Sequence, residues 1–168
     1  QVGPEVTRFV MLTRKNDAPL DFDFDVAMET SKENPVWYVQ YAHARVASIL
    51  RKAAEDGFAI SEVDLKSAPM GELTHPEELA LLKKVAEWPR LVEGAAQARE
   101  PHRIAFYLYD LASAFHARQH AGKMDPEQRF LRKDAQEITK ARLAMIRTTS
   151  VVIAAGLGIL GITPAEDM

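Results

Sequence analysis

The residues best suited to binding chemistry are aromatic and basic side chains that share one face of an expected helix. Trp37, Tyr41 and Arg45 follow one another at intervals of four residues, so a helix places them in one stripe. Single-stranded bases stack on aromatic rings and guanidinium groups, at about 1–3 kcal/mol per base. The same spacing fits a helix that buries its aromatic residues in a core and leaves Arg45 at the rim. Taken alone, this helix favours the core interpretation and leaves base stacking as the alternative.

Three alternating aspartates, Asp21, Asp23 and Asp25, are the next candidates for chemistry. A calcium-binding loop needs Gly at its sixth position and Glu at its twelfth, where this chain has Val26 and Lys32. No base or nucleophile lies near the aspartates in the sequence. They therefore indicate a solvated or salt-bridged linker.

Two histidines, His116 and His120, lie four residues apart and could face one metal ion from a helix. The pair lacks the Glu of an H-E-x-x-H motif and the chain has no cysteine, so surface histidines near a helix end are the favoured interpretation. The sequence also lacks phosphate-loop and nucleophile-elbow motifs, and Gly156, Gly158 and Gly161 miss the dinucleotide spacing. We therefore expect no catalytic residue, no metal and no cofactor in this chain.

The composition of the 168 residues, 47% hydrophobic and 27% charged, is typical of a soluble globular protein. The net charge of −3 argues mildly against nucleic-acid binding, although residues 101–168 carry 9 basic and 7 acidic groups. The charged first residues show no secretory signal. Glycines interrupt the uncharged run 148–165 and Pro164 closes it, so we expect a buried helix and not a membrane span. These features predict a cytoplasmic protein.

Helical periodicity dominates the chain and predicts an all-α fold. Helices are expected after Pro4, from 34 to about 55, from about 76, from Pro101 and from about 138 to 160. Asn34 and Thr74 are the predicted N-caps, Gly57 is the predicted stop, and Pro89 is expected to kink or split its helix. The last helix has two apolar stripes, so it should be the long central helix of a bundle of about five. Residues 14–25 and 58–73 are expected to be irregular.

Four segments, in order, resemble the C-terminal part of arginyl-tRNA synthetases. Residues 2–23 are similar to the junction after that family's catalytic core, and residues 34–45 are similar to the helix that opens its anticodon-binding domain. Residues 101–116 fit the middle helices, and residues 139–168 fit the C-terminus. The resemblance covers nearly the whole chain and implies a DALR-type helical bundle. Two residues depart from the pattern: Glu5 stands where Asp is common, and Asp167 stands where Arg is frequent, which removes a possible phosphate contact.

The resemblance also implies a site. Tyr41 and Arg45 would contact the anticodon loop of a tRNA, while Phe115 and Met168 would help to form the pocket. Arg142 and Arg147 are expected to contact phosphates. The predicted RNA-binding residues are Tyr38, Gln40, Tyr41, Arg45, Phe115, Arg142 and Met168.

The domain prediction places a remnant of the junction with a catalytic domain at residues 1–33 and the anticodon-binding domain at 34–168. The expected partners are arginine tRNA and that catalytic domain. The adenylate-forming His-x-Gly-His and Lys-Met-Ser-Lys-like motifs are absent, so ATP would be used only by the full-length enzyme and this chain alone should be inactive. The alternative is a structural helical module that docks on another domain through Phe22 and Phe24 and makes no RNA contact.

Overall fold

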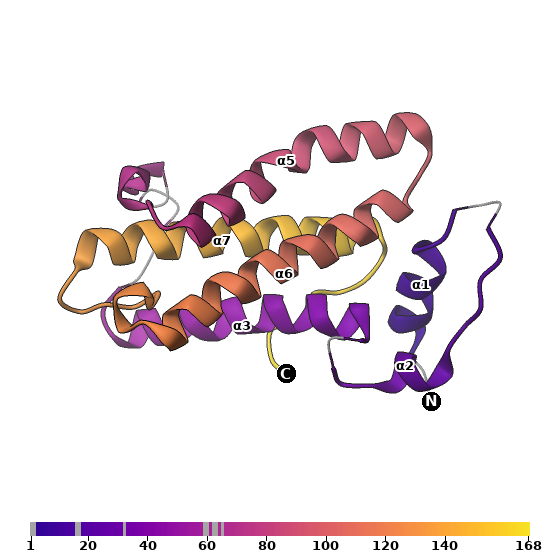
Figure 1. Ribbon diagram of the computed structural model, residues 1–168, viewed down its shortest axis with the longest axis horizontal. Coiled ribbons are helices and arrows are strands. Elements are labelled where there is room, and N and C mark those ends of the chain that lie inside the picture. Colours follow the sequence, from indigo (N-terminus) through magenta and orange to yellow (C-terminus); the bar gives the residue numbers. More distant parts are fainter. Residues whose placement is uncertain (1–2, 16–17, 32, 59–60, 62–63, 65) are drawn as a thin grey trace.

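Four long helices form the body of the protein, and two short ones lie at one end of it (Figure 1). The computed structural model describes residues 3–15, 18–31, 33–58, 61, 64 and 66–168. Within these ranges there are helices and turns and no strand, as predicted. The elements are α1 (Pro4–Leu12), α2 (Phe24–Met28), α3 (Pro35–Glu55), the 3₁₀ turn η1 (Met70–Glu72), α5 (Pro76–Ala98), α6 (His102–Met124), the 3₁₀ turn η2 (Pro126–Gln128) and α7 (Gln136–Ile159).

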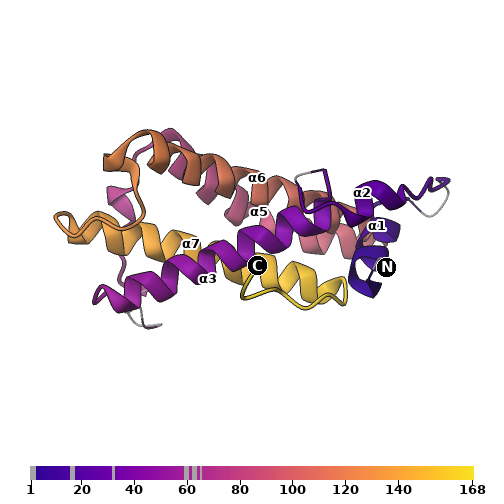
Figure 2. The same ribbon diagram turned by 90° about the horizontal axis from the view of Figure 1, so that it is seen from below.

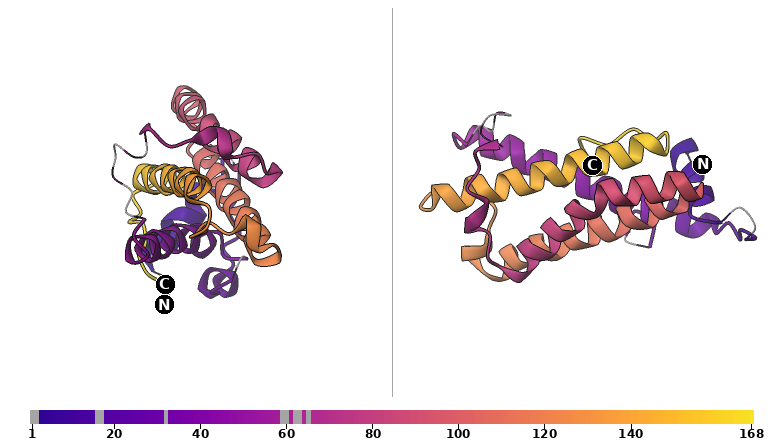
Figure 3. Two further views of the ribbon diagram at one scale, coloured as in Figure 1. Left: turned by 90° about the vertical axis from the view of Figure 1, so that its left-hand side faces the viewer. Right: turned by 90° about the horizontal axis from the view of Figure 1, so that it is seen from above.

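The long helices α3, α5, α6 and α7 run side by side as a bundle, seen end-on in Figure 3. Helix α7 packs against α3, α5 and α6, which confirms its predicted central place. Helix α1 packs on α3 and α6 near the start of α3. After α7 the chain turns back, and the C-terminal end lies beside α3 (Figure 2).

The start of α3 follows the capping chemistry that the sequence predicts. The Asn34 side-chain oxygen accepts hydrogen bonds from the backbone N–H groups of Val36 and Trp37, both at 3.2 Å, which satisfies donors that the first turn leaves free. The same side chain donates to the carbonyl oxygens of Ala27 and Glu29, so it also ties α2 to α3. Helix α3 ends at Glu55, just before Gly57.

Three local predictions need correction. The N-cap of α5 is His75 and not Thr74, and it forms a capping box with Glu78. Of the two outcomes expected at Pro89, a kink or a split, the split does not occur, because α5 continues through the proline on an exposed face. The stretch 14–25 was expected to be irregular, but its end belongs to α2, where the Asp23 carboxylate accepts from the N–H groups of Asp25 and Val26.

Helix α7 buries one of its two predicted stripes completely. Leu143, Ile146, Ser150, Ile153, Leu157 and Leu160 are all buried, whereas Thr148, Ala155 and Ile159 of the other stripe are exposed. At Gly156 the helix approaches α6 so closely that an added Cβ atom would lie 2.6 Å from the Leu108 side chain. By length and composition α7 could cross a membrane, but 61% of its most apolar window is buried inside the bundle. This burial supports the predicted core helix.

A buried ionic cluster joins α5, α6 and α7. One oxygen of the Glu78 carboxylate accepts from Arg118 at 2.8 Å and from Arg142 at 2.7 Å. The other carboxylate oxygen accepts from the His75 N–H group. The two arginines also donate to the carbonyl oxygens of Glu127, Gln128 and Arg129, so they order the turn between α6 and α7. All three charged side chains are at most 5% exposed.

The Glu78→Gln variant should therefore be strongly destabilised. A neutral amide leaves two buried guanidinium groups without a counter-charge, and such losses cost about 3–5 kcal/mol. Urea unfolding followed by circular dichroism measures the change in the free energy of unfolding. Glu93→Gln is the matched control, because Glu93 is exposed on the same helix. An equal loss in both variants would contradict the role of the cluster.

The cluster also predicts a pH dependence. Burial by itself raises the pKa of Glu78, but hydrogen bonds from Arg142 and Arg118 outweigh it and hold that pKa below its usual value. A lowered folded-state pKa gives stability that is fully present above the unfolded pKa, about 4.3, and is lost as the pH falls through the folded pKa. The difference in unfolding free energy between wild type and Glu78→Gln should thus be constant from pH 7 to about 5 and shrink below about 4. A gap that already narrows between pH 7 and 5 would argue against this assignment.

Candidate nucleic-acid interface

The site begins with the chain reversal that follows α7. Gly161 has a positive φ of 69°, a conformation that glycine adopts without strain, and it redirects the chain toward α1. The Arg8 guanidinium donates to the Gly161 carbonyl oxygen at 2.6 Å. The Glu5 carboxylate accepts from the Thr163 N–H group at 3.0 Å. Helix α1 therefore fixes the first part of the C-terminal segment, residues 160–168.

Helix α3 holds the next part of the C-terminal segment. The Gln40 amide donates to the Thr163 carbonyl oxygen at 2.8 Å and accepts from the Ala165 N–H group at 2.7 Å. His43 Nδ1 lies 2.7 Å from the Ala165 carbonyl oxygen, and because a carbonyl only accepts, this nitrogen carries the proton. Further along α3, Arg51 pairs with the Asp167 carboxylate. These contacts return the C-terminal segment to the face of α3 that carries Tyr41.

The return of the C-terminal segment closes a cavity of about 210 Å³, called the Tyr41 cavity below. Its lining consists of Tyr41, Ala44, Arg45, Ser48, Arg51, Asp167 and Met168. Three of the predicted RNA-binding residues, Tyr41, Arg45 and Met168, are thus brought together although 127 positions separate the first from the last (168 − 41). Within the described part of the chain, Arg45 Nε is buried without a hydrogen-bond partner. Such a donor is costly unless a ligand or water satisfies it.

Aromatic rings stack outward from the Tyr41 cavity. Tyr41 is stacked on Trp37, with ring centroids 5.0 Å apart and planes 6° apart, and also on His116, at 5.4 Å and 21°. Trp37 and Tyr41 are half-buried, so they are neither core residues nor fully free. Tyr38 lies beside His116 at 4.6 Å and does not line the cavity. A base could therefore contact only the part of the Tyr41 ring that Trp37 and His116 leave exposed.

His116 has a structural role in this stack. Burial lowers the pKa of His116, against the smaller opposing effect of its contact with the Tyr38 carbonyl oxygen, so the ring is uncharged at neutral pH. His120 is exposed on the next turn. Among the residues that the structure describes, no group of three His, Cys, Asp or Glu side chains could hold a metal ion.

Three predicted RNA contacts lie inside the protein instead. Phe115 is fully buried and stacks on Phe130 at 6.0 Å. Arg142 is 4% exposed and belongs to the Glu78 cluster. Gln40 is 7% exposed, and both ends of its amide bind the C-terminal segment. In this structure these three side chains offer almost no surface to a ligand, and the RNA contacts expected of them stay predictions.

Sequence reasoning missed Ser48 and Arg51 in the lining. Both continue the helical stripe of Tyr41 and Arg45, at seven and ten residues beyond Tyr41, so extending the period would have found them. Arg51, Arg147 and His43 also line a neighbouring cavity of about 330 Å³ between α3 and α7. The predicted phosphate contact Arg147 is exposed there. Basic side chains therefore follow the C-terminal segment on two sides.

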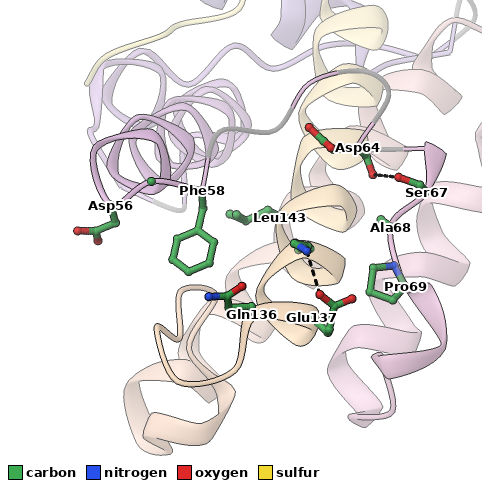
Figure 4. A pocket seen from close by; sticks show the side chains of 11 residues that line it. Asp56, Phe58, Asp64, Ser67, Ala68, Pro69, Gln136, Glu137 and Leu143 are labelled. Carbon is green, nitrogen blue, oxygen red and sulfur yellow. Dashed lines mark hydrogen bonds and ion pairs between the residues drawn. The ribbon is translucent and has the colours of Figure 1, made fainter.

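A further cavity, of about 310 Å³, lies at the opposite end of α3, where α7 begins (Figure 4). Phe58 and Leu143 line it together with an ion pair between Lys140 and Glu137, 2.9 Å apart. Its cation is already paired, and the cavity contains none of the predicted RNA-binding residues. The candidate site is therefore the Tyr41 cavity.

An all-helical bundle that places stacked aromatic rings beside an unpartnered arginine belongs to the class of α-helical binding domains. The family model of the DALR anticodon binding domain matches residues 39–168. The chain therefore belongs to the DALR anticodon-binding domain family. This confirms the helical bundle that the resemblance implied.

The relatives agree with this family. The chain is 60% identical over all 168 residues to the arginine–tRNA ligases of Ruegeria pomeroyi and of Roseobacter denitrificans, and it covers 29% of each. The solved Thermus thermophilus arginyl-tRNA synthetase aligns with a TM-score of 0.74 at 29% identity, over 98% of this chain and 26% of that one. The arginyl-tRNA synthetase of Plasmodium falciparum, at 21% identity and a TM-score of 0.74, shares the fold over the same fractions. The chain thus spans less than a third of the length of these relatives.

Proposed function

We propose that this chain binds the anticodon loop of an arginine tRNA, as the anticodon-binding part of an arginine–tRNA ligase. The observation that carries the proposal is the unpartnered Arg45 nitrogen beside Tyr41 and Met168. A splayed base can stack on an aromatic ring or pack on a flexible thioether while its ring atoms accept hydrogen bonds from a guanidinium group. The 60% identity to two arginine–tRNA ligases supports the same proposal.

In the whole protein, the reaction of arginine, ATP and tRNA would take place outside this chain. The chain covers 29% of the matching ligases, and its sequence contains neither of the two adenylate-forming motifs. Its contribution is to hold one end of the tRNA while the other end is charged. A cytoplasmic location is part of the proposal.

The second proposed partner is the rest of the same protein. Phe24, Met28 and Met11 are 64%, 55% and 59% exposed on α1 and α2. Such apolar side chains, gathered near one end of the bundle, suit a contact between domains. We assign this surface, together with the predicted junction 1–33, to the catalytic domain. Membership of an anticodon-binding family favours RNA binding over docking as the main task.

Replacing both Tyr41 and Arg45 by Ala in the full-length protein should weaken binding of arginine tRNA by about 10- to 100-fold, because a stacking surface and a hydrogen-bond donor are both lost. Fluorescence anisotropy at fixed salt measures the dissociation constant. The control variant is Arg90→Ala, because Arg90 is exposed on α5 outside the cavity lining. Two results would contradict the proposal: the wild type binds arginine tRNA and a tRNA with a scrambled anticodon equally well, or it binds neither at low salt.

Arg147 should act on phosphate and not on sequence. Arg147→Ala is expected to reduce the slope of log K against log salt by about 0.7, the value for one contact to a single strand. The loss of affinity should be the same for the arginine tRNA and for the scrambled one. Measuring both tRNAs from 50 to about 200 mM salt tests this. A loss confined to the arginine tRNA would show that Arg147 reads bases.

A further inference from the structure

Gln40 was expected to contact RNA, but in the structure its side chain contacts the protein. It extends from α3 to the C-terminal segment, and its amide makes two hydrogen bonds to the backbone of residues 163 and 165. His43, one turn later on α3, binds the Ala165 carbonyl oxygen and is itself 6% exposed. These two buried side chains face the protein and not the solvent.

We propose that Gln40, assisted by His43, is a positioning residue of the Tyr41 cavity: it acts on RNA only through the C-terminal segment, by fixing where Met168 stands opposite Tyr41. The inference rests on the proposed function for its RNA part. We call the hydrogen bonds of Gln40 and His43 to residues 163 and 165 the clamp. Without the clamp, the cavity would lose the wall that Asp167 and Met168 provide. Tyr41 and Arg45 would remain, but on an open helix face.

The chemistry of the clamp explains why an amide stands at this position. Residues 163–165 form no regular secondary structure, so their backbone groups make hydrogen bonds with side chains. The Thr163 carbonyl oxygen and the Ala165 N–H group both bond to Gln40, and the Ala165 carbonyl oxygen bonds to His43. The Gln40 amide supplies one donor, which bonds the Thr163 carbonyl oxygen, and one acceptor, which bonds the Ala165 N–H group. A carboxylate in its place could accept from Ala165 but would repel the Thr163 carbonyl oxygen.

The ion pair of Arg51 with Asp167 cannot replace this clamp. The two side chains are 52% and 81% exposed, and exposed pairs contribute little and are screened by salt. The hydrogen bonds of Gln40 and His43 are shielded from water by their burial. Among the contacts that α3 makes with the segment, the buried ones of Gln40 and His43 therefore contribute more than the exposed ion pair.

The test uses the full-length protein with Gln40→Ala, and with Gln97→Ala as the matched control, because Gln97 is an exposed glutamine whose amide donates to Glu93 on its own helix. Ala favours a helix, so α3 should fold, which circular dichroism checks. Amide hydrogen exchange of residues 160–168 should accelerate in Gln40→Ala and not in the control. The dissociation constant for arginine tRNA should rise about tenfold in Gln40→Ala. Gln40→Glu should release the segment as well. A carboxylate keeps the hydrogen bond from the Ala165 N–H group but loses the one to the Thr163 carbonyl oxygen and repels that oxygen.

A double-mutant cycle with Met168→Ala separates positioning from a direct contact. If Gln40 acts through Met168, Gln40→Ala should add less than about twofold in the Met168→Ala background. Unchanged exchange in Gln40→Ala, unchanged affinity despite a released segment, or fully additive effects would each overturn the inference. If the wild type binds no tRNA, the proposed function fails together with the RNA role of Gln40. The exchange data still decide in that case whether Gln40 holds the segment.

Discussion

The bundle depends on one buried carboxylate. Glu78 accepts hydrogen bonds from Arg118 of α6 and Arg142 of α7, and its own helix is α5, so three helices share a single charge. Taking these groups out of water costs several kcal/mol per ion, and only a dense set of hydrogen bonds offsets that cost. The arginines find the remaining acceptors in the backbone of residues 127–129. The same ionic cluster that joins the three helices therefore also orders the turn between α6 and α7, which sets the direction of α7.

The direction of α7 decides whether a site exists. The C-terminal segment follows the end of α7 and reverses direction at Gly161. It then accepts hydrogen bonds first from a side chain of α1 and next from a side chain of α3. One wall of the Tyr41 cavity comes from α3 and the other from this segment. A change in the angle between α3 and α7 would move the two walls relative to each other, since no regular structure links them. Core packing and binding geometry are thus coupled through a few backbone contacts.

Periodicity and capping residues were enough to predict the fold. Asn34, Gly57 and the stripes of α7 act locally, so the sequence around them predicts their roles. The site was harder to predict than the fold, because the type of a residue does not show which other residues its side chain contacts. Arg142 was expected to contact phosphate, although it lies between Ala141 and Leu143 of the two apolar stripes, a position that could have suggested an inward side chain. Gln40 follows Val36 by four residues on the buried face of α3, and its partners, more than 120 positions away, could not be predicted from any local pattern.

The acidic net charge of −3 is a weak argument against a polyanionic ligand. At physiological salt the Debye length is about 8 Å, so charges on distant faces of the bundle are largely screened at the Tyr41 cavity. What matters is the local set of cations. Asp167 neutralises Arg51, whereas in the described part of the chain Arg45 and Arg147 have no ion-pair partner. If the proposed RNA binding takes place here, a site with so few free cations would gain less from phosphates than from bases, and base contacts are the ones that carry sequence selectivity.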